Sequence, residues 1–243
     1  MDKEALEAIA LNYHLAENIP DMFIENICQD FELEWIKSRI GNDSKVLDLG
    51  LGDNRFLRAF LNHEHVTILE ASAHLCKAAS EIIVDNNSKT QVIETFFENF
   101  DADAEYDVVI ASHVLEHVEE PNLLFTKILS WLKPEGIALV IVPNRESLHR
   151  QLGVEMGIHN ELDWLSPRDN AVGHKRVYSL KSLTHQAVQA GFKVVEHRGF
   201  FIKSLANSQM LHLNPRVILG LCEISTNLPT ELGANIGLVL NRA

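Results

Sequence analysis

The chain has 243 residues, of which 46% are hydrophobic and 23% charged, the usual proportions for one sizeable folded domain. Lysine and arginine number 21 against 34 aspartates and glutamates, so the formal net charge is -13. A charge of this sign repels nucleic-acid phosphates and anionic membrane surfaces, which disfavours a non-specific nucleic-acid or membrane binder. The composition also excludes collagen-like, disordered and small disulfide-scaffold classes.

Three scattered cysteines, Cys28, Cys76 and Cys222, form no C-x-x-C pair, so neither a disulfide framework nor a zinc knot is indicated. The first residues are acidic, and the longest apolar run, residues 137–142, is too short to cross a bilayer. We therefore expect a cytoplasmic protein without a targeting or membrane segment.

Residues 1–40 have the pattern of two or three helices, and Leu33, Ile36 and Ile40 are spaced to pack the last of them onto a sheet. From Lys45 onward, short β-branched runs alternate with amphipathic stretches, as in β-α units that build a parallel sheet. Six strands are predicted, at residues 45–49, 66–69, 90–93, 107–111, 137–142 and 192–196. A seventh run, residues 236–240, is expected to form an edge strand.

Two of the intervening helices carry clear start and stop signals. Pro121 suits a first helical turn, and apolar residues follow at helical spacing up to Leu132. Ser179 can cap a second helix, which Gly191 ends before the sixth strand. Residues 143–177 break the alternation, and a long stretch without predicted structure is typical of a lid or binding loop.

A glycine turn follows the first strand, in the sequence D-L-G-L-G-D-N at residues 48–54, and a helix is predicted over residues 55–61. Glycines there let the backbone approach a ligand, although a tight turn alone would also use Gly50 and Gly52. Glu70, twenty residues beyond Gly50, ends the second strand, where an acid can accept hydrogen bonds from both ribose hydroxyls.

A nicotinamide dehydrogenase is a weaker interpretation, because the third glycine of G-x-G-x-x-G is replaced by Arg55, whose side chain would obstruct a pyrophosphate. Asp48, two residues before the first glycine, suits instead a ligand that carries an ammonium group. S-adenosylmethionine is such a ligand.

Five segments in order resemble the class I S-adenosylmethionine-dependent methyltransferases of the small-molecule type. They are D-L-G-L-G at residues 48–52, Glu70, Y-D-V-V-I-A-S-H at 106–113, V-L-E-H-V at 114–118, and L-K-P-E-G followed by V-P-N within 132–144. The resemblance covers roughly residues 33–200. It implies an α/β, Rossmann-like, seven-stranded and mostly parallel sheet with helices on both faces, and S-adenosylmethionine as cofactor.

The resemblance also implies which residues bind the cofactor. The glycine loop would surround the methionine part, Glu70 the ribose, two phenylalanines the adenine, and the end of the fourth strand the sulfonium. Asn54 stands where the family usually has a third loop glycine, and asparagine can still adopt a left-handed conformation. The residues assigned in this way are Asp48, Gly50, Leu51, Gly52, Asn54, Glu70, Ala71, Phe96, Phe97, Ser112 and His113.

Methyl transfer from a sulfonium is an in-line displacement, so the protein has to align the acceptor and remove any proton that it carries. Histidine is the natural base near neutral pH, and the candidates by position are His113 and His174. His117 is expected to fix the start of a helix by a hydrogen bond. His113, Glu116 and His117 could also ligate a metal, but the family generally needs none, so no metal is predicted.

Basic residues and one tyrosine near the ligand-binding edge are the candidates for binding an anionic acceptor, and a solvated basic turn is the alternative explanation for several of them. These candidates are Arg145, Lys175, Arg176, Tyr178 and Lys203. His174 to Tyr178 also resemble the H-x-R-x-Y/F segment found before the same helix in many small-molecule methyltransferases.

We therefore expect one domain over residues 1–243, with a helical cap (1–40), a cofactor-binding core (41–142), an acceptor-side lid (143–177) and the rest of the sheet (178–243). The expected reaction is methyl transfer to a small polar or anionic metabolite, with oxygen favoured as the acceptor atom. Transfer to nitrogen, transfer to a protein side chain, and an inactive cofactor-binding partner subunit remain alternatives. No nucleic-acid or membrane partner is expected, and a homodimer is left open.

Overall fold

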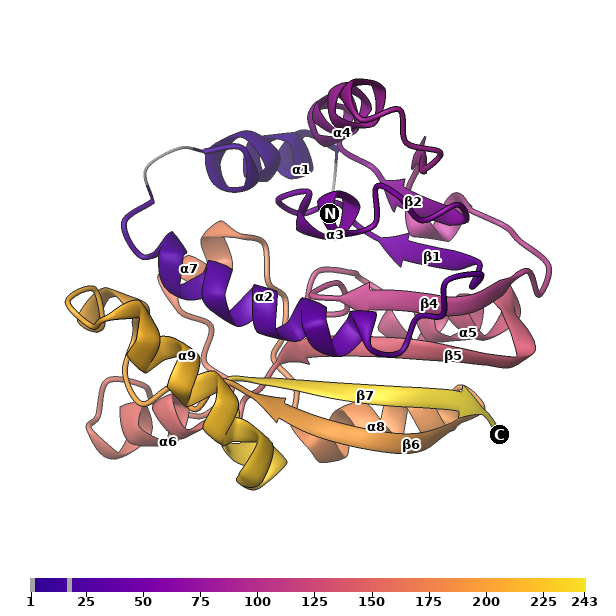
Figure 1. Ribbon diagram of the computed structural model, residues 1–243. Helices are drawn as coiled ribbons and strands as arrows, with labels where there is room; N and C mark the ends of the chain where they lie inside the picture. Colours follow the sequence, from indigo (N-terminus) through magenta and orange to yellow (C-terminus); the bar gives the residue numbers. More distant parts are fainter. Residues whose placement is uncertain (1–2, 17–18) are drawn as a thin grey trace.

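The computed structural model describes residues 3–16 and 19–243 and contains a seven-stranded sheet in the order β3-β2-β1-β4-β5-β7-β6 (Figure 1). Neighbouring strands from β3 to β5 are parallel, whereas β7 is antiparallel to both β5 and β6. The strands are β1 (Val46–Leu49), β2 (Val66–Glu70), β3 (Gln91–Glu94), β4 (Tyr106–Ser112), β5 (Leu132–Pro143), β6 (Phe192–Phe200) and β7 (Asn235–Arg242). The predicted mostly parallel α/β sheet is confirmed.

The predicted edge position of the seventh strand is wrong. β7 lies between β5 and β6, and its residues from Ile236 to Leu240 are all buried. Several residues in the middle of β6 are exposed, which is tolerable at an edge but not in the interior. A strand with a continuous apolar run, such as β7, buries more of its side chains inside the sheet than at its edge.

Helices cover both faces of the sheet, as predicted. On one face α5 and α8 pack against alternate strand residues such as Leu47 and Val109. On the other face α2, α3 and α4 pack against residues such as Val46 and Val108. The helices are α1 (Lys3–Ile9), α2 (Met22–Lys37), α3 (Arg55–Ala59), α4 (Ala73–Asp85), α5 (Pro121–Trp131), α6 (Leu148–Glu155), α7 (Pro167–Ala171), α8 (Leu180–Gln189) and α9 (Pro215–Ile224).

The local signals at two helix ends act as the sequence predicts. Ser179 caps α8, because its side chain accepts a hydrogen bond from the Ser182 backbone N–H. Gly191 follows that helix with a φ of 95°, a conformation that favours glycine. The prediction that His117 fixes the start of a helix is wrong. Residues 115–117 form a turn, and α5 begins only at Pro121.

The N-terminal segment is helical, with α1, a π-helical turn at Ala10–His14, and α2, while residues 1–2 and 17–18 of the predicted cap lie outside the described residues. Ile36 of α2 is buried against the sheet, as expected. α9 packs on α2 through a separate apolar cluster that includes Ile24 and Ile218. In the described residues, every helix is too short or too polar to cross a membrane.

The insertion at residues 143–177 contains regular structure that the sequence did not predict, namely α6 and α7. α7 begins with a capping box, in which Ser166 and Asp169 each bond the other's backbone N–H, and Pro167 occupies its first turn. Arg150 of α6 is buried and reaches the carbonyl of Trp164 at 2.7 Å and the Asp169 carboxylate at 3.1 Å. These contacts fold the insertion against itself.

Candidate active site

A cavity of ≈ 1160 Å³ opens at the carboxyl ends of β1, β2 and β4, beneath the N-terminal helices and beside the insertion. This volume is at or above the upper end of the usual range for ligand pockets, about 300 to 1,000 Å³. It therefore has room for two ligands side by side. Ten of the eleven predicted cofactor-binding residues line it, namely Asp48, Gly50, Leu51, Gly52, Glu70, Ala71, Phe96, Phe97, Ser112 and His113.

The glycine loop between β1 and α3 takes three left-handed backbone conformations. Gly50 has a φ of 89° and Gly52 one of 51°, and Asn54 accepts a φ of 62° at the start of α3. The positive φ rather than crowding selects glycine, because a Cβ at Gly50 or Gly52 would meet no atom within 4 Å. The expected left-handed conformation of Asn54 is confirmed, although its buried side chain does not belong to the cavity lining.

Glu70 fixes this loop while it faces the cavity. Its Oε2 accepts a hydrogen bond of 3.0 Å from the Leu51 backbone N–H, and its Oε1 accepts one of 2.7 Å from the Ser72 backbone N–H. Burial raises the pKa of the Glu70 carboxyl, although these bonds act in the opposite direction. Each oxygen retains a lone pair that can accept a hydrogen bond from a ligand hydroxyl.

Asp48 lies one strand away and is 4% exposed. Burial raises the pKa of its carboxyl well above the usual range. Among the described residues, the groups that act on the Asp48 carboxyl are the Leu49 backbone and Glu70 and include no side-chain cation, so a ligand ammonium group would supply the missing charge. A buried acid for an ammonium and a second acid for a diol match S-adenosylmethionine, and the residues present therefore fit this cofactor.

His113 follows β4 with a φ of 55°, which is unusual for a residue other than glycine and is held by a 2.8 Å bond from its N–H to the Ile141 carbonyl. Its Nε2 lies 2.9 Å from Glu32 Oε2, and its Nδ1 lies 3.4 Å from Glu116 Oε1. Burial lowers the pKa of His113, but the two carboxylates raise it well above the usual value. A protonated His113 can donate hydrogen bonds but cannot take a proton.

His174 has the arrangement expected of a base. Its Nδ1 lies 3.0 Å from Asp169 Oδ1, which orients the ring, and its side chain lines the cavity. The ring of His117 lies against it, with centroids 4.8 Å apart. Burial lowers the pKa of His117 to about 4, so this imidazole is neutral at pH 7.

Of the predicted acceptor-binding residues, Lys203 lines the cavity. Arg145 instead lies 3.7 Å from Asp163, and Lys175 pairs with Glu119 at 2.7 Å. Arg176 and Tyr178 donate hydrogen bonds to the Leu115 carbonyl, at 2.9 and 3.3 Å, and so hold the turn after β4. The structure does not bring Arg145, Lys175, Arg176 or Tyr178 to the described cavity wall, because salt bridges and backbone carbonyls occupy them.

Sequence reasoning did not identify Glu32, Glu7 or Asp169, although each orders part of this cavity. Glu32 is 2% exposed and also accepts a 2.7 Å bond from Asn235 Nδ2. The sequence feature that could have identified Glu32 is an acidic residue among the apolar positions of α2. For Asp169 it is the S-P-R-D capping pattern at residues 166–169. Neither pattern indicates by itself that the acid faces a ligand site.

Comparisons with known proteins agree with this geometry. The sequence pattern of a family described as a methyltransferase domain matches residues 20–197. Ubiquinone biosynthesis O-methyltransferase of Rickettsia bellii is 30% identical over 138 residues, which cover 54% of this chain and 56% of that protein. The protein of the same description from Rickettsia canadensis is 24% identical over 197 residues, covering 80% and 82%. This chain thus spans about half the length of the first curated relatives that it matches.

Solved structures show the same fold at low identity. A Thermotoga maritima S-adenosylmethionine-dependent methyltransferase has a TM-score of 0.65 and 16% identity, and the match covers 99% of each chain. One from Mesorhizobium loti has a TM-score of 0.61 and 15% identity, with 87% of this chain and 98% of that chain covered. With a family match over most of its length, the chain belongs to the class I S-adenosylmethionine-dependent methyltransferases, as its motifs predicted.

Proposed function

We propose that this protein transfers a methyl group from S-adenosylmethionine to an oxygen of a small polar or anionic metabolite. The observation that carries the proposal is one cavity with two unlike ends: buried acids beside a glycine loop at one, and the Asp169–His174 pair at the other. Its relatives from Rickettsia bellii and Rickettsia canadensis are described as O-methyltransferases, which supports oxygen as the acceptor atom.

The acids and the glycine loop form the cofactor end. We assign the ribose hydroxyls to Glu70, the amino group to Asp48, and the adenine ring to Phe96 and Phe97 at the end of β3. When bound, S-adenosylmethionine supplies a methyl group that is activated by its sulfonium. Ser112 and His113, at the end of β4, then lie where they can border the reacting centre.

The acceptor end lies between β4 and residues 143–177, which we propose act as the acceptor-side lid. His174 is placed to remove the proton of an acceptor hydroxyl, because Asp169 holds its Nδ1 and leaves Nε2 for the acceptor. Lys203 at the same cavity supplies a cation for an anionic acceptor, although burial lowers its pKa. His113, charged between Glu32 and Glu116, is better suited to orienting groups by donation.

A two-stage experiment tests the proposal. Calorimetry with S-adenosylhomocysteine measures binding at the cofactor end, and the absence of binding would contradict the proposal at once. A screen with a labelled methyl donor against phenols, catechols, hydroxy acids and amines then identifies the acceptor atom. Transfer to amines alone would mean that the acceptor atom is nitrogen and not oxygen. Cofactor binding without any methyl transfer would favour a cofactor-binding subunit.

A further inference from the structure

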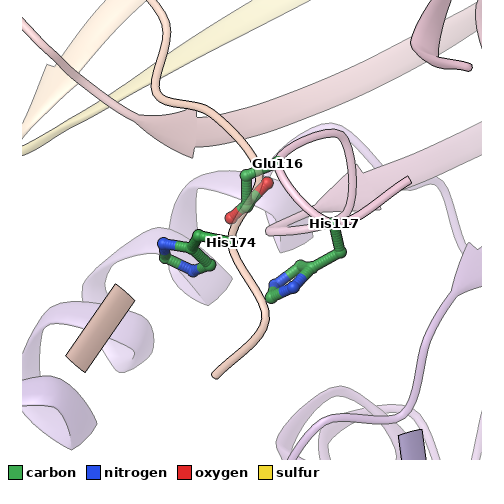
Figure 2. Close-up of side chains that lie close together, drawn as sticks. All are labelled: Glu116, His117 and His174. Carbon is green, nitrogen blue, oxygen red and sulfur yellow. The ribbon is translucent and has the colours of Figure 1, made fainter. Parts of the chain in front are cut away.

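Three potential metal ligands meet at the acceptor end of the cavity. Glu116 and His117 come from the turn after β4, and His174 from the segment before α8 (Figure 2). One ligand atom of each lies within 4.8 Å of the other two. The three side chains lie close together although 58 positions separate Glu116 from His174.

One of the two imidazoles is already oriented by a hydrogen bond, and the other packs against it. His174 Nδ1 lies 3.0 Å from Asp169 Oδ1, and the ring centroid of His117 lies 4.8 Å from that of His174. A ring nitrogen that donates to an oxygen leaves the other nitrogen with a free lone pair. Such outer partners are the usual companions of metal-binding histidines.

Glu116 provides an independent observation. It is fully buried, and neither carboxylate oxygen accepts a hydrogen bond within the usual limits. The His113 Nδ1 forms an ion pair with Oε1 at 3.4 Å, which is too long for a good hydrogen bond. A buried carboxylate without hydrogen bonds is costly, and a cation bound between it and the two imidazoles would add to the compensation that the ion pair with His113 gives.

We infer that Glu116, His117 and His174 bind one divalent transition-metal cation. Two imidazoles and one carboxylate are the ligand set of catalytic zinc sites and of many iron(II) sites, whereas Mg²⁺ and Ca²⁺ prefer oxygen ligands. Small side-chain rotations have to shorten the 4.8 Å spread to about 3.3 Å, the ligand separation of a tetrahedral zinc site. This inference departs from the metal-free site that the sequence predicted.

The cation would face the acceptor. His117 and His174 line the cavity, so a site held by three protein ligands keeps its open position on that side. This role rests on the proposed function: a cation there binds an acceptor oxygen and lowers the pKa of its hydroxyl. In the cation-bound state His174 Nε2 is a ligand, and without the cation the same atom is the base.

The test measures cation binding alone, without cofactor or acceptor. The chain of residues 1–243, freed of metal by a chelator, is titrated with Zn²⁺ by calorimetry and with Co²⁺ by visible absorption. Mg²⁺ is titrated in parallel. We expect one equivalent of Zn²⁺ or Co²⁺, with a tetrahedral or five-coordinate Co²⁺ spectrum, and much weaker Mg²⁺ binding. Glu116→Gln, His117→Ala and His174→Ala should each weaken Zn²⁺ binding at least about 100-fold.

His185→Ala, on α8 and outside the cavity lining, is the matched histidine control and should bind Zn²⁺ as the wild type does. Circular dichroism checks that each variant is folded. If Glu116→Gln does not fold, the variants at the half-buried His117 and His174 still test the inference. Zn²⁺ binding that is absent, or unchanged in both histidine variants, would overturn the inference. Methyl transfer by the metal-free protein would leave the proposed function standing, so the two failures are distinguishable.

Discussion

Glu7 of α1 accepts a 2.6 Å hydrogen bond from the Oγ of Ser72, the residue that caps the N-terminus of α4. The same carboxylate accepts a bond of 2.7 Å from the Ala73 backbone N–H and lies 2.7 Å from His74 Nδ1. A carboxylate is favoured at a helix N-terminus by the free N–H groups and the helix dipole. This contact therefore fastens the N-terminal cap next to Glu70, at the cofactor end of the cavity.

Glu7→Gln should release the cap. We expect faster hydrogen exchange in α1 and weaker S-adenosylhomocysteine binding, because helix residues such as Leu6 and Ile9 line the cavity. Glu4→Gln, an exposed acid on the same helix, is the control and should change neither quantity. Equal exchange rates in the wild type and Glu7→Gln would show that the contact does not hold the cap.

The same contact should depend on pH. Burial raises the pKa of Glu7, but bonds from Ser72, His74 and two backbone N–H groups lower it to about 2 from 4.5. A folded-state pKa below the unfolded one stabilises the protein above pH 4.5, and this contribution is lost as the pH falls towards 2. Urea unfolding of the wild type and Glu7→Gln at pH 7, 5 and 3 should show a difference in unfolding free energy that shrinks with acidification; a constant difference would refute this.

Glu70→Gln should weaken cofactor binding. Losing hydrogen bonds to a charged acceptor costs about 1.5 to 3 kcal/mol each, which is roughly a 10- to 150-fold rise in the dissociation constant. Calorimetry with S-adenosylhomocysteine measures the affinity, and Glu81→Gln, an exposed acid on α4 outside the cavity lining, is the control. Unchanged affinity in folded Glu70→Gln would remove Glu70 from the ribose site.

The sequence predicted most strands of the sheet and the conformation of the glycine loop, because both depend on local patterns. Apolar runs and the glycine turn act within a few residues, so β1, the loop conformation of Asn54 and the cap at Ser179 followed directly. The position of β7 could not be predicted in this way, since pairing with β5 and β6 is a long-range choice.

The acceptor end was less predictable for the same reason. Arg176 and Tyr178 are polar residues at the ligand-binding edge of the sheet, but their partners are carbonyls 57 to 63 positions away along the chain. The charge state of His113 depends on Glu32, which comes from a helix 81 positions earlier. Spacing along the sequence indicates neither contact.

The Asp169–His174 pair should matter for turnover more than His113 does as a base. Once an acceptor is identified, His174→Ala and Asp169→Asn should lower kcat by about 10² to 10⁴ and about 10-fold respectively, with little change in cofactor affinity. His185→Ala is the control. Wild-type kcat in His174→Ala would exclude this residue from proton removal, and an already ionised acceptor would then explain the activity.

The last prediction concerns the stability of the insertion, which depends on a buried arginine. The side chains of Arg150 and Asp169 are only 9% and 15% exposed, and Arg150 also donates to the carbonyls of Leu162 and Trp164. Removing one partner of a buried ion pair costs about 3 to 5 kcal/mol, so Arg150→Met should lower the unfolding free energy by about that amount. Arg145→Met, whose pair with Asp163 is long and exposed, should cost at most about 1 kcal/mol. Urea unfolding of both variants gives the comparison, and hydrogen exchange locates the loss in residues 143–177. Equal stabilities of the two variants would mean that Arg150 does not hold the insertion together.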